Sequence, residues 1–323
     1  MTSPQVSILV PVYNREKLLC ECLESALGQI FSDFEVVVCD NASTDRTWQV
    51  CQEFAQRDPR IRIFRNDTNV GPVRNWQRCF NEARGTFGSV LFSDDLLKPT
   101  FLAETLPWIQ DPQVGFVFTQ AEIGTEPGNG RIAYQCLPAS SAVSSETFIY
   151  AAVRGREVAI SPGHALFRME DLRKSLVLDI PSPTFSNFAS HGAGIDRLLF
   201  LLTASRYTKI AFVAAPLAFF RSHQTSITLN LDRSRYSDYH HQANVWYALQ
   251  SGNPGLLKLA MARAWLSAMN TQRRFVSPVE IHKKYIVDDT RPVSMQTLLS
   301  QSLRIVTNVL IRRLHLPEKY ALA

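Results

Sequence analysis

Short β-branched segments alternate with amphipathic segments along the first third of the chain, and this alternation restricts the fold more than any other feature of the sequence. Short apolar runs of this kind are typical of strands that are buried on both faces of a sheet. The segments predicted as strands are residues 6–12, 34–39, 61–64, 89–92 and 114–119. The segments with helical periodicity are residues 16–30, 44–56, 72–83 and 100–109. The alternation predicts an α/β fold with a Rossmann-like, mostly parallel sheet sandwiched by helices.

The regular alternation ends after residue 119. Glycine, proline, serine and asparagine become frequent in residues 124–130 and 138–145, which predicts loops. The elements predicted beyond these loops are a helix at residues 194–202, a pair of strands at residues 209–213 and 215–220, and several helices from residue 232 onward. The sequence therefore predicts an α/β domain followed by a helical C-terminal extension.

The composition is that of a soluble globular protein, because 46% of the 323 residues are apolar and 20% are charged. No apolar run reaches the ~18 residues that a transmembrane helix needs, so none is predicted. The charge is uneven: residues 1–232 hold 21 Lys and Arg against 24 Asp and Glu (net −3), whereas residues 233–323 hold 13 against 5 (net +8). None of the six cysteines forms a C-x-x-C pair, which favours free thiols and a cytoplasmic location.

Acidic and amide side chains follow several of the predicted strands. Asp40 comes directly after the second strand, and Asp94 and Asp95 follow the fourth. Ligands of open parallel sheets bind at the carboxyl ends of the strands. Two adjacent carboxylates repel each other, and a Mg²⁺ or Mn²⁺ ion shared with a diphosphate relieves that repulsion. Each motif taken alone is explained as well or better by a turn or a helix N-cap, and only their joint occurrence favours a binding site.

Three common motifs are absent from the chain. It has no dinucleotide fingerprint G-x-G-x-x-G after the first strand, no P-loop G-x-x-x-x-G-K-[ST], and no hydrolase motif G-x-S-x-G. Any phosphate group bound here is therefore expected to be held by a metal ion and basic side chains. A nucleic-acid partner is not predicted, because no recognition motif appears and the basic residues are not interleaved with aromatic ones.

Four segments, in order along the chain, resemble the family 2 glycosyltransferases of the GT-A fold. They are VSILVPVYNRE, FEVVVCDNASTDRTWQV, NVGPVRNWQRCFNEARG and LFSDDLLKP. The resemblance is strong over residues 5–120 and looser up to about residue 228. It implies a GT-A catalytic domain over residues 1–231, with a nucleotide-sugar-binding half at 1–120 and an acceptor-binding half at 121–231. The helical C-terminal extension then covers residues 232–323.

The resemblance also implies a donor site at the strand ends. In that family the end of the first strand and an aspartate after the second hold the nucleotide base, which implies Pro11, Tyr13 and Asp40 here. An asparagine-glycine loop and the arginine after it line the nucleotide and the diphosphate, which implies Asn69, Gly71 and Arg74 here. The family therefore predicts a nucleotide-sugar donor, most simply a UDP-sugar.

The acidic motif after the fourth strand binds the ribose and the metal in that family, which implies Asp94 and Asp95 here. Asp95 is expected to be the main ligand of the divalent cation, Mn²⁺ or Mg²⁺. Phe92 departs from the family pattern, because an aspartate is often found at its position.

The remaining candidates come from the second half of the α/β domain. An acidic residue that opens a helix often acts as general base in that family, which implies Asp196 here. Locally, the helix dipole explains an acidic residue at a helix N-terminus equally well. The segment PLAFFRSHQTSIT resembles an Arg-x-His ending, which implies Arg221 at the diphosphate and His223 at the metal or phosphate. His164 is a weaker candidate for the acceptor pocket, and packing is its better explanation.

The leading hypothesis is an inverting, metal-dependent glycosyltransferase that acts on a hydroxyl group of a glycan or lipid-linked acceptor in surface polysaccharide biosynthesis. One displacement inverts the anomeric carbon, and no covalent nucleophile is evident. A nucleotidyltransferase is disfavoured, because PVYNREK lacks the glycines of its phosphate loop. A catalytically degenerate module that binds a nucleotide sugar or a partner is the alternative.

The basic C-terminal segment has two explanations. Apolar residues recur at helical spacing between residues 295 and 314, with Arg304, Arg312 and Arg313 among them. Such a helix could lie on an anionic membrane at its inner face, where a lipid-linked acceptor is found. Packing against the catalytic domain or in a homodimer is the favoured explanation.

Overall fold

The computed structural model describes residues 3–223, 233–287, 292–314 and Leu322. The helices are α1 (Leu19–Leu27), α2 (Thr47–Arg57), α3 (Pro72–Glu82), α4 (Phe101–Ile109), α5 (Ser145–Val153), α6 (Met169–Ser175), α7 (Ile195–Ala204), α9 (Arg233–Gln250), α10 (Pro254–Gln272), α11 (Pro278–Tyr285) and α12 (Met295–Leu314). The strands are β1 (Val6–Val12), β2 (Phe34–Asp40), β3 (Ile61–Arg65), β4 (Phe87–Val90), β5 (Leu96–Leu97), β6 (Val114–Gly124), β7 (Arg131–Ala133), β8 (Ser141–Ser144), β9 (Ala165–Arg168) and β10 (Lys209–Arg221).

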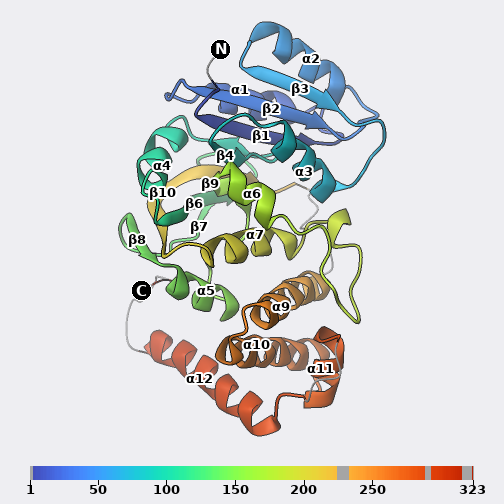
Figure 1. Ribbon diagram of the computed structural model, residues 1–323, viewed down its shortest axis with the longest axis vertical. Helices are drawn as coiled ribbons and strands as arrows, with labels where there is room; N and C mark the ends of the chain where they lie inside the picture. The colour runs from blue at the N-terminus through green and yellow to red at the C-terminus, as the bar shows by residue number, and fades with distance from the viewer. Residues whose placement is uncertain (1–2, 224–232, 288–291, 315–321, 323) are drawn as a thin grey trace.

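The strands form one mixed sheet in the order β3-β2-β1-β4-β9-β6-β10-β5, with β7 paired to β6 and β8 paired to β10. Strands β3, β2, β1 and β4 pair in parallel, and so do β6 and β10. Val12 of β1 lies beside Asp40 of β2, so the loops after both strands leave from the same edge of the sheet. The predicted α/β fold, with a Rossmann-like sheet between helices, is confirmed (Figure 1).

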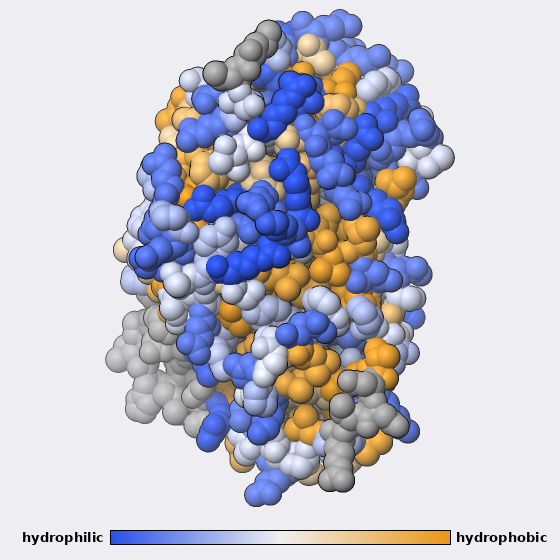
Figure 2. Space-filling model, in the orientation of Figure 1, coloured by the Kyte–Doolittle hydropathy of each residue, from blue (hydrophilic) through white to orange (hydrophobic). Residues whose placement is uncertain are grey.

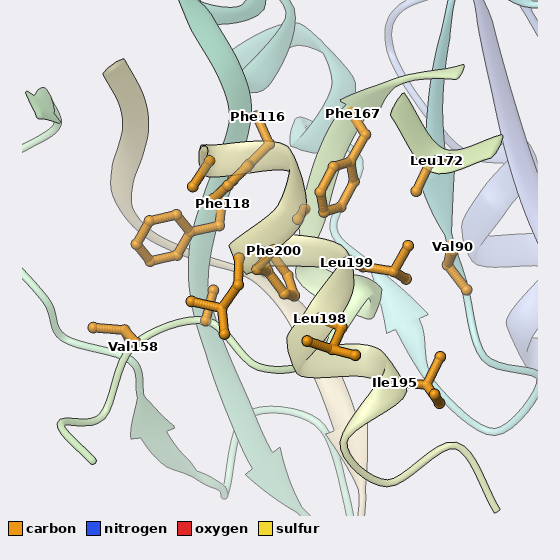
Figure 3. Packing of buried hydrophobic residues seen from close by; sticks show 14 of the residues in the cluster. Val90, Phe116, Phe118, Val158, Phe167, Leu172, Ile195, Leu198, Leu199 and Phe200 are labelled. Carbon is orange, nitrogen blue, oxygen red and sulfur yellow. The ribbon is translucent and has the colours of Figure 1, made fainter. Parts of the chain in front are cut away.

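The core explains why these segments form strands and helices. Every residue of β1 and β2 is buried, as the continuous apolar runs predict. A second part of the core lies under α7, where Phe116 of β6 and Phe167 of β9 pack on Phe200 (Figure 3). The ring centroids of Phe116 and Phe167 lie 5.1 and 5.2 Å from that of Phe200. This aromatic packing fixes α7, the helix that carries Asp196, against the sheet.

The predicted pair of strands at residues 209–213 and 215–220 is wrong, because this segment forms the single strand β10. It pairs with β6 along its length, and the register shifts between Val213 and Pro216. Proline has no N–H to donate to the neighbouring strand, and a bulge accommodates it without ending the strand. Strand β10 therefore runs on to Arg221, at the edge where β1 and β4 end.

The helical extension is present and gathers at one end of the molecule, beyond α5 and α7 (Figure 1). Helix α9 packs on α7 and α10, and α12 packs on α10. The predicted domain boundary at residue 231 lies outside the described residues. Figure 2 shows apolar patches among hydrophilic residues on this lower half of the molecule. No described helix combines the length and the hydropathy that crossing a membrane requires.

Candidate active site

A pocket of about 1100 Å³ opens at the carboxyl ends of β1, β2 and β4. Its walls come from the loops after these strands, from the first turn of α3, and from the segment that leads into α7. Most of the residues predicted from the sequence line it: Pro11, Tyr13, Asn69, Gly71, Arg74, Asp94, Asp95, Asp196 and Arg221. The fold therefore brings candidates from both halves of the α/β domain to one site.

A network of asparagine side chains beside the pocket joins the loop after β2 to the loop before α3. The Asn41 amide nitrogen donates to Asn69 Oδ1 at 2.8 Å, and Asn41 Oδ1 accepts from Asn66 Nδ2 at 3.0 Å. Gly71 donates its N–H to Asn69 Oδ1 at 2.9 Å and has a φ of +84°, which favours glycine. A Cβ at Gly71 would also lie only 3.1 Å from the carbonyl oxygen of Ala189. The predicted loop around Asn69 and Gly71 is thus held rigidly at the pocket.

Asp40 lies beneath the pocket and does not line it. Its side chain is fully buried, its Oδ2 lies 3.0 Å from Arg65 Nε, and its Oδ1 accepts from the Ser43 N–H at 3.2 Å. The contact with a nucleotide base that the sequence predicts for Asp40 therefore stays a prediction. Tyr13, by contrast, is 38% exposed at the rim, where a flat ligand can stack on its ring.

The two adjacent carboxylates lie at the exit of β4. Asp95 is 8% exposed, and its Oδ1 accepts from the backbone N–H of Arg221 at 2.9 Å. Burial, and then the charge of Asp94, raise the pKa of Asp95 well above its usual range. Asp94 Oδ2 lies 3.7 Å from an Arg15 guanidinium nitrogen. The local charge is thus only partly compensated within the protein.

The end of β10 brings Arg221 and His223 to this acidic pair. His223 Nε2 lies 2.7 Å from Asp94 Oδ2. The Arg221 guanidinium donates to the Asp94 carbonyl oxygen at 3.2 Å and to Glu21 Oε2 at 2.5 Å. Arg221 and His223 therefore lie beside the acidic motif, and their predicted roles at the diphosphate and at the metal or phosphate stay predictions.

A hard divalent cation suits the donor atoms at this place. Asp94 lies beside His223, and the charges of Arg221 and Arg15 compensate the neighbouring buried Asp95 carboxylate only in part. In the part of the chain that the structure describes, no group of three or more His, Cys, Asp or Glu side chains is arranged to hold a metal alone. The residues therefore fit an ion that takes its other ligands from diphosphate oxygens and water, as Mg²⁺ does.

Asp196 lines the same pocket from the first turn of α7. Its Oδ1 accepts from the N–H groups of Gly194 at 3.0 Å and Arg197 at 2.7 Å. Burial raises the pKa of Asp196 to about 7, and the backbone hydrogen bonds oppose that rise. A carboxyl group with this pKa exchanges a proton readily near neutral pH, which suits a general base.

The environments of His164 and Phe92 bear on two further points raised by the sequence. His164 is fully buried, its Nδ1 lies 2.6 Å from the Thr119 carbonyl oxygen, and burial lowers its pKa to about 4, in agreement with a packing role. Phe92 lines the pocket and packs on Trp76, with ring centroids 5.6 Å apart. An apolar ring thus occupies the place where the resemblance leads one to expect a carboxylate.

Sequence reasoning missed several residues of the pocket. Arg15 lies three residues after the end of β1, and Trp76 lies in α3, so a strand-end position and a helix beside the site are the signals that indicate them. His191 directly precedes a loop segment with two glycines, and Tyr236 comes from α9 in the C-terminal extension. Nothing in the local sequence around Tyr236 indicates a site, because its position depends on the packing of α9 against α7.

Known proteins resemble both the sequence and the fold. A sequence model described as "Glycosyl transferase family 2" matches residues 7–176, more than half of the chain. Glycosyltransferase GlyG of Streptococcus pneumoniae is 28% identical over 115 residues, which are 36% of this chain and 38% of that protein. Chondroitin synthase of Escherichia coli is 40% identical over 97 residues, 30% of this chain and 14% of that protein. The chain thus matches less than half the length of these relatives.

Among solved structures, S. aureus TarS 1–349 in complex with UDP-GlcNAc is similar over 95% of this chain and 81% of that chain. The TM-score is 0.65 and the sequence identity is 17%, a likeness that concerns the fold. The ordered strand-end motifs, the sheet and the matched span of residues 7–176 agree with one another. The chain therefore belongs to glycosyl transferase family 2.

Proposed function

We propose that this chain is an inverting, metal-dependent glycosyltransferase that moves a sugar from a nucleotide-sugar donor to a hydroxyl group of a glycan or glycolipid. The observation that carries the proposal is that a poised base, Asp196, lines the same pocket as the acidic pair Asp94 and Asp95. One side of the pocket thus suits a diphosphate with its cation, and the other suits an acceptor hydroxyl.

The donor would lie along the strand ends. The exposed ring of Tyr13 and the backbone at Pro11 would contact the base, and the loop with Asn69 and Gly71 would contact the nucleotide. Arg74, exposed in the first turn of α3, would meet the diphosphate. A UDP-sugar is the donor we favour, because the structural relative TarS binds UDP-GlcNAc.

The divalent cation would be held by Asp95 as main ligand, with Asp94 and His223 beside it. When bound, it would supply positive charge that stabilises the diphosphate as leaving group. Arg221 would add a further positive charge at the same place. The contacts between the acidic pair after β4 and the end of β10 would keep these side chains together beside the pocket.

Asp196 would act on the acceptor. Its ionised carboxylate would accept the proton of an acceptor hydroxyl while the oxygen attacks the anomeric carbon and the bond to the diphosphate breaks. This single displacement inverts the anomeric configuration. The names of relatives such as chondroitin synthase support a polysaccharide acceptor, and so a role in surface polysaccharide biosynthesis.

The test uses the purified chain and a panel of nucleotide sugars with Mn²⁺. A thermal shift identifies the donor, and release of nucleoside diphosphate in the presence of acceptors measures turnover. We expect Asp95→Ala to lose metal-dependent turnover, and Asp179→Ala, which removes another carboxylate of the pocket wall, to keep it. Full metal-dependent turnover by Asp95→Ala would contradict the assignment of the metal site.

A second function, nucleotide-sugar binding without turnover, is favoured by one observation. Phe92 places an aromatic ring against Trp76 at a strand end where the family often has a carboxylate. Wild-type protein that binds a nucleotide sugar tightly but never transfers or hydrolyses it would support this function.

The membrane contact and the homodimer predicted for α12 stay proposals, and the exposed apolar residues of this helix support them. Leu299 is 48% and Leu303 65% exposed, whereas Leu298 is buried. Co-sedimentation with anionic liposomes tests the peripheral membrane contact, and sedimentation velocity tests the homodimer, each with Leu303→Gln as the comparison. The cytoplasmic location stays a prediction.

A further inference from the structure

Helix α9 of the C-terminal extension reaches the wall of the candidate active site. Tyr236 lines the pocket, and one turn later His240 Nδ1 lies 3.9 Å from Asp196 Oδ1. The rings of Tyr236 and His240 pack edge to face with centroids 4.5 Å apart. Both residues lie outside the span 7–176 that the family model matches.

We infer that α9 completes the acceptor side of the site and that His240 is a positioning residue for the carboxylate of Asp196. This inference rests on the proposed function, because it concerns the base of the same reaction. The C-terminal extension then contributes residues to the active site, whereas the sequence predicts only a docking or oligomerisation role for this extension.

The backbone of α9 fixes the turn that carries the base. Gly194, which precedes α7, has a φ of +87°, and a Cβ there would lie 2.7 Å from the carbonyl oxygen of Tyr239. The N–H of Gly194 donates to Asp196 Oδ1 at 3.0 Å. The close approach of α9 therefore sets the position of a donor that holds the carboxylate.

The side chain of His240 acts through Arg197. Arg197 Nε donates to His240 Nδ1 at 3.4 Å, and its Nη1 donates to the Ala152 carbonyl oxygen at 2.9 Å. A guanidinium group has only donors, so Nδ1 must be the unprotonated nitrogen and the imidazole is neutral, with its proton on Nε2. His240 and Ala152 thus hold the guanidinium beside Asp196, whose carboxylate bonds the backbone N–H of Arg197 and not the charged group.

The surroundings of His240 keep it neutral. Burial, together with the positive charge of Arg197 and with His241 and His191 nearby, lowers the pKa of His240 well below its usual range. His240 Nε2 is also buried without a hydrogen-bond partner among the described residues. A buried N–H without a partner destabilises a fold, so a purely structural role would favour an apolar side chain at this position.

The experiment compares His240→Phe, which keeps the ring and removes the acceptor, with His240→Asn, whose Oδ1 can replace Nδ1. We expect His240→Phe to lower kcat by about 10- to 100-fold, because small misplacements of a catalytic group have such effects. Nucleotide affinity should not fall, and His240→Asn should recover most of the lost kcat. His241→Phe is the control, because His241 is also a buried imidazole on α9 but bonds Ser237 instead.

The outcomes separate this inference from the proposed function. A kcat of His240→Phe within twofold of wild type, or equal losses in His240→Phe and His240→Asn, would overturn the inference while transfer by wild type stands. If wild type transfers no sugar from any nucleotide sugar, the proposed function fails, and hydrogen exchange of the peptide spanning residues 190–200 decides the inference alone. Faster exchange in His240→Phe but not in His240→Asn would support it, and unchanged exchange would overturn it.

Discussion

Replacing Asp196 by asparagine should make the protein more stable at alkaline pH. The side chain of Asp196 is only 15% exposed, and burial raises its pKa from 3.8 to about 7. The folded state therefore binds this proton more tightly than the unfolded state does. The stabilisation that this tighter proton binding gives to the folded state is fully present below about pH 4 and is lost as the pH rises through about 7.

The size of the effect follows from the two pKa values. Between pH 5 and pH 8, a carboxyl group with a folded pKa of about 7 and an unfolded pKa of 3.8 lowers the free energy of unfolding by about 2.5 kcal/mol. Asparagine does not titrate, and its Oδ1 can still accept from the Gly194 and Arg197 N–H groups. In Asp196→Asn, the free energy of unfolding should therefore not show this fall between pH 5 and pH 8.

Urea denaturation of wild type and variant at pH 5 and pH 8 measures the effect as a double difference, in which all other titrating groups cancel. Asp179→Asn, at an exposed carboxylate of the same pocket, serves as the control. A double difference below about 0.5 kcal/mol, or one of opposite sign, would refute the reasoning that burial of Asp196 destabilises its charged form.

Three further predictions follow from the site and its supports. The kcat of wild type should rise about tenfold from pH 6 to pH 8, because the ionised fraction of a base with a pKa of about 7 rises by that factor; a flat profile would exclude Asp196 as the base. Asp95→Asn should weaken Mn²⁺ binding at least about tenfold in calorimetry with a nucleoside diphosphate present, and unchanged affinity would remove Asp95 from the metal site. Gly194→Ala should lower the free energy of unfolding by about 1–3 kcal/mol more than Gly252→Ala, because a Cβ at Gly252 meets open space; equal losses in urea denaturation would contradict the close packing of α7 on α9.

The alternation of strands and helices could be predicted because it follows from burial on both faces of a sheet. The ends of β1, β2 and β4 lie within a few residues of the predicted ends, and the acidic pair after β4 lies in the pocket. The error at β10 has a local cause, since Pro216 suggests a break that a bulge in pairing with β6 avoids. Sequence patterns therefore identify what a strand end offers but not how a strand continues through an irregularity.

The parts of the site that sequence could not provide depend on tertiary packing. Asp40 lies at the end of β2, close to its expected place, yet Arg65 holds it beneath the pocket wall. Tyr236 and His240 come from a helix with no motif, and only the contact of α9 with α7 brings them to Asp196. Such contacts join segments far apart in the chain, and no periodicity or spacing encodes them locally.

The most direct test of the account is transfer of a labelled sugar to an acceptor by wild type, Asp196→Asn and the control Asp179→Asn, with the anomeric configuration of the product determined by NMR. The account predicts an inverted product from wild type and Asp179→Asn. It predicts a kcat about 10²- to 10⁴-fold lower in Asp196→Asn at unchanged donor affinity. Transfer by Asp196→Asn at the wild-type rate, or a product with retained configuration, would contradict it.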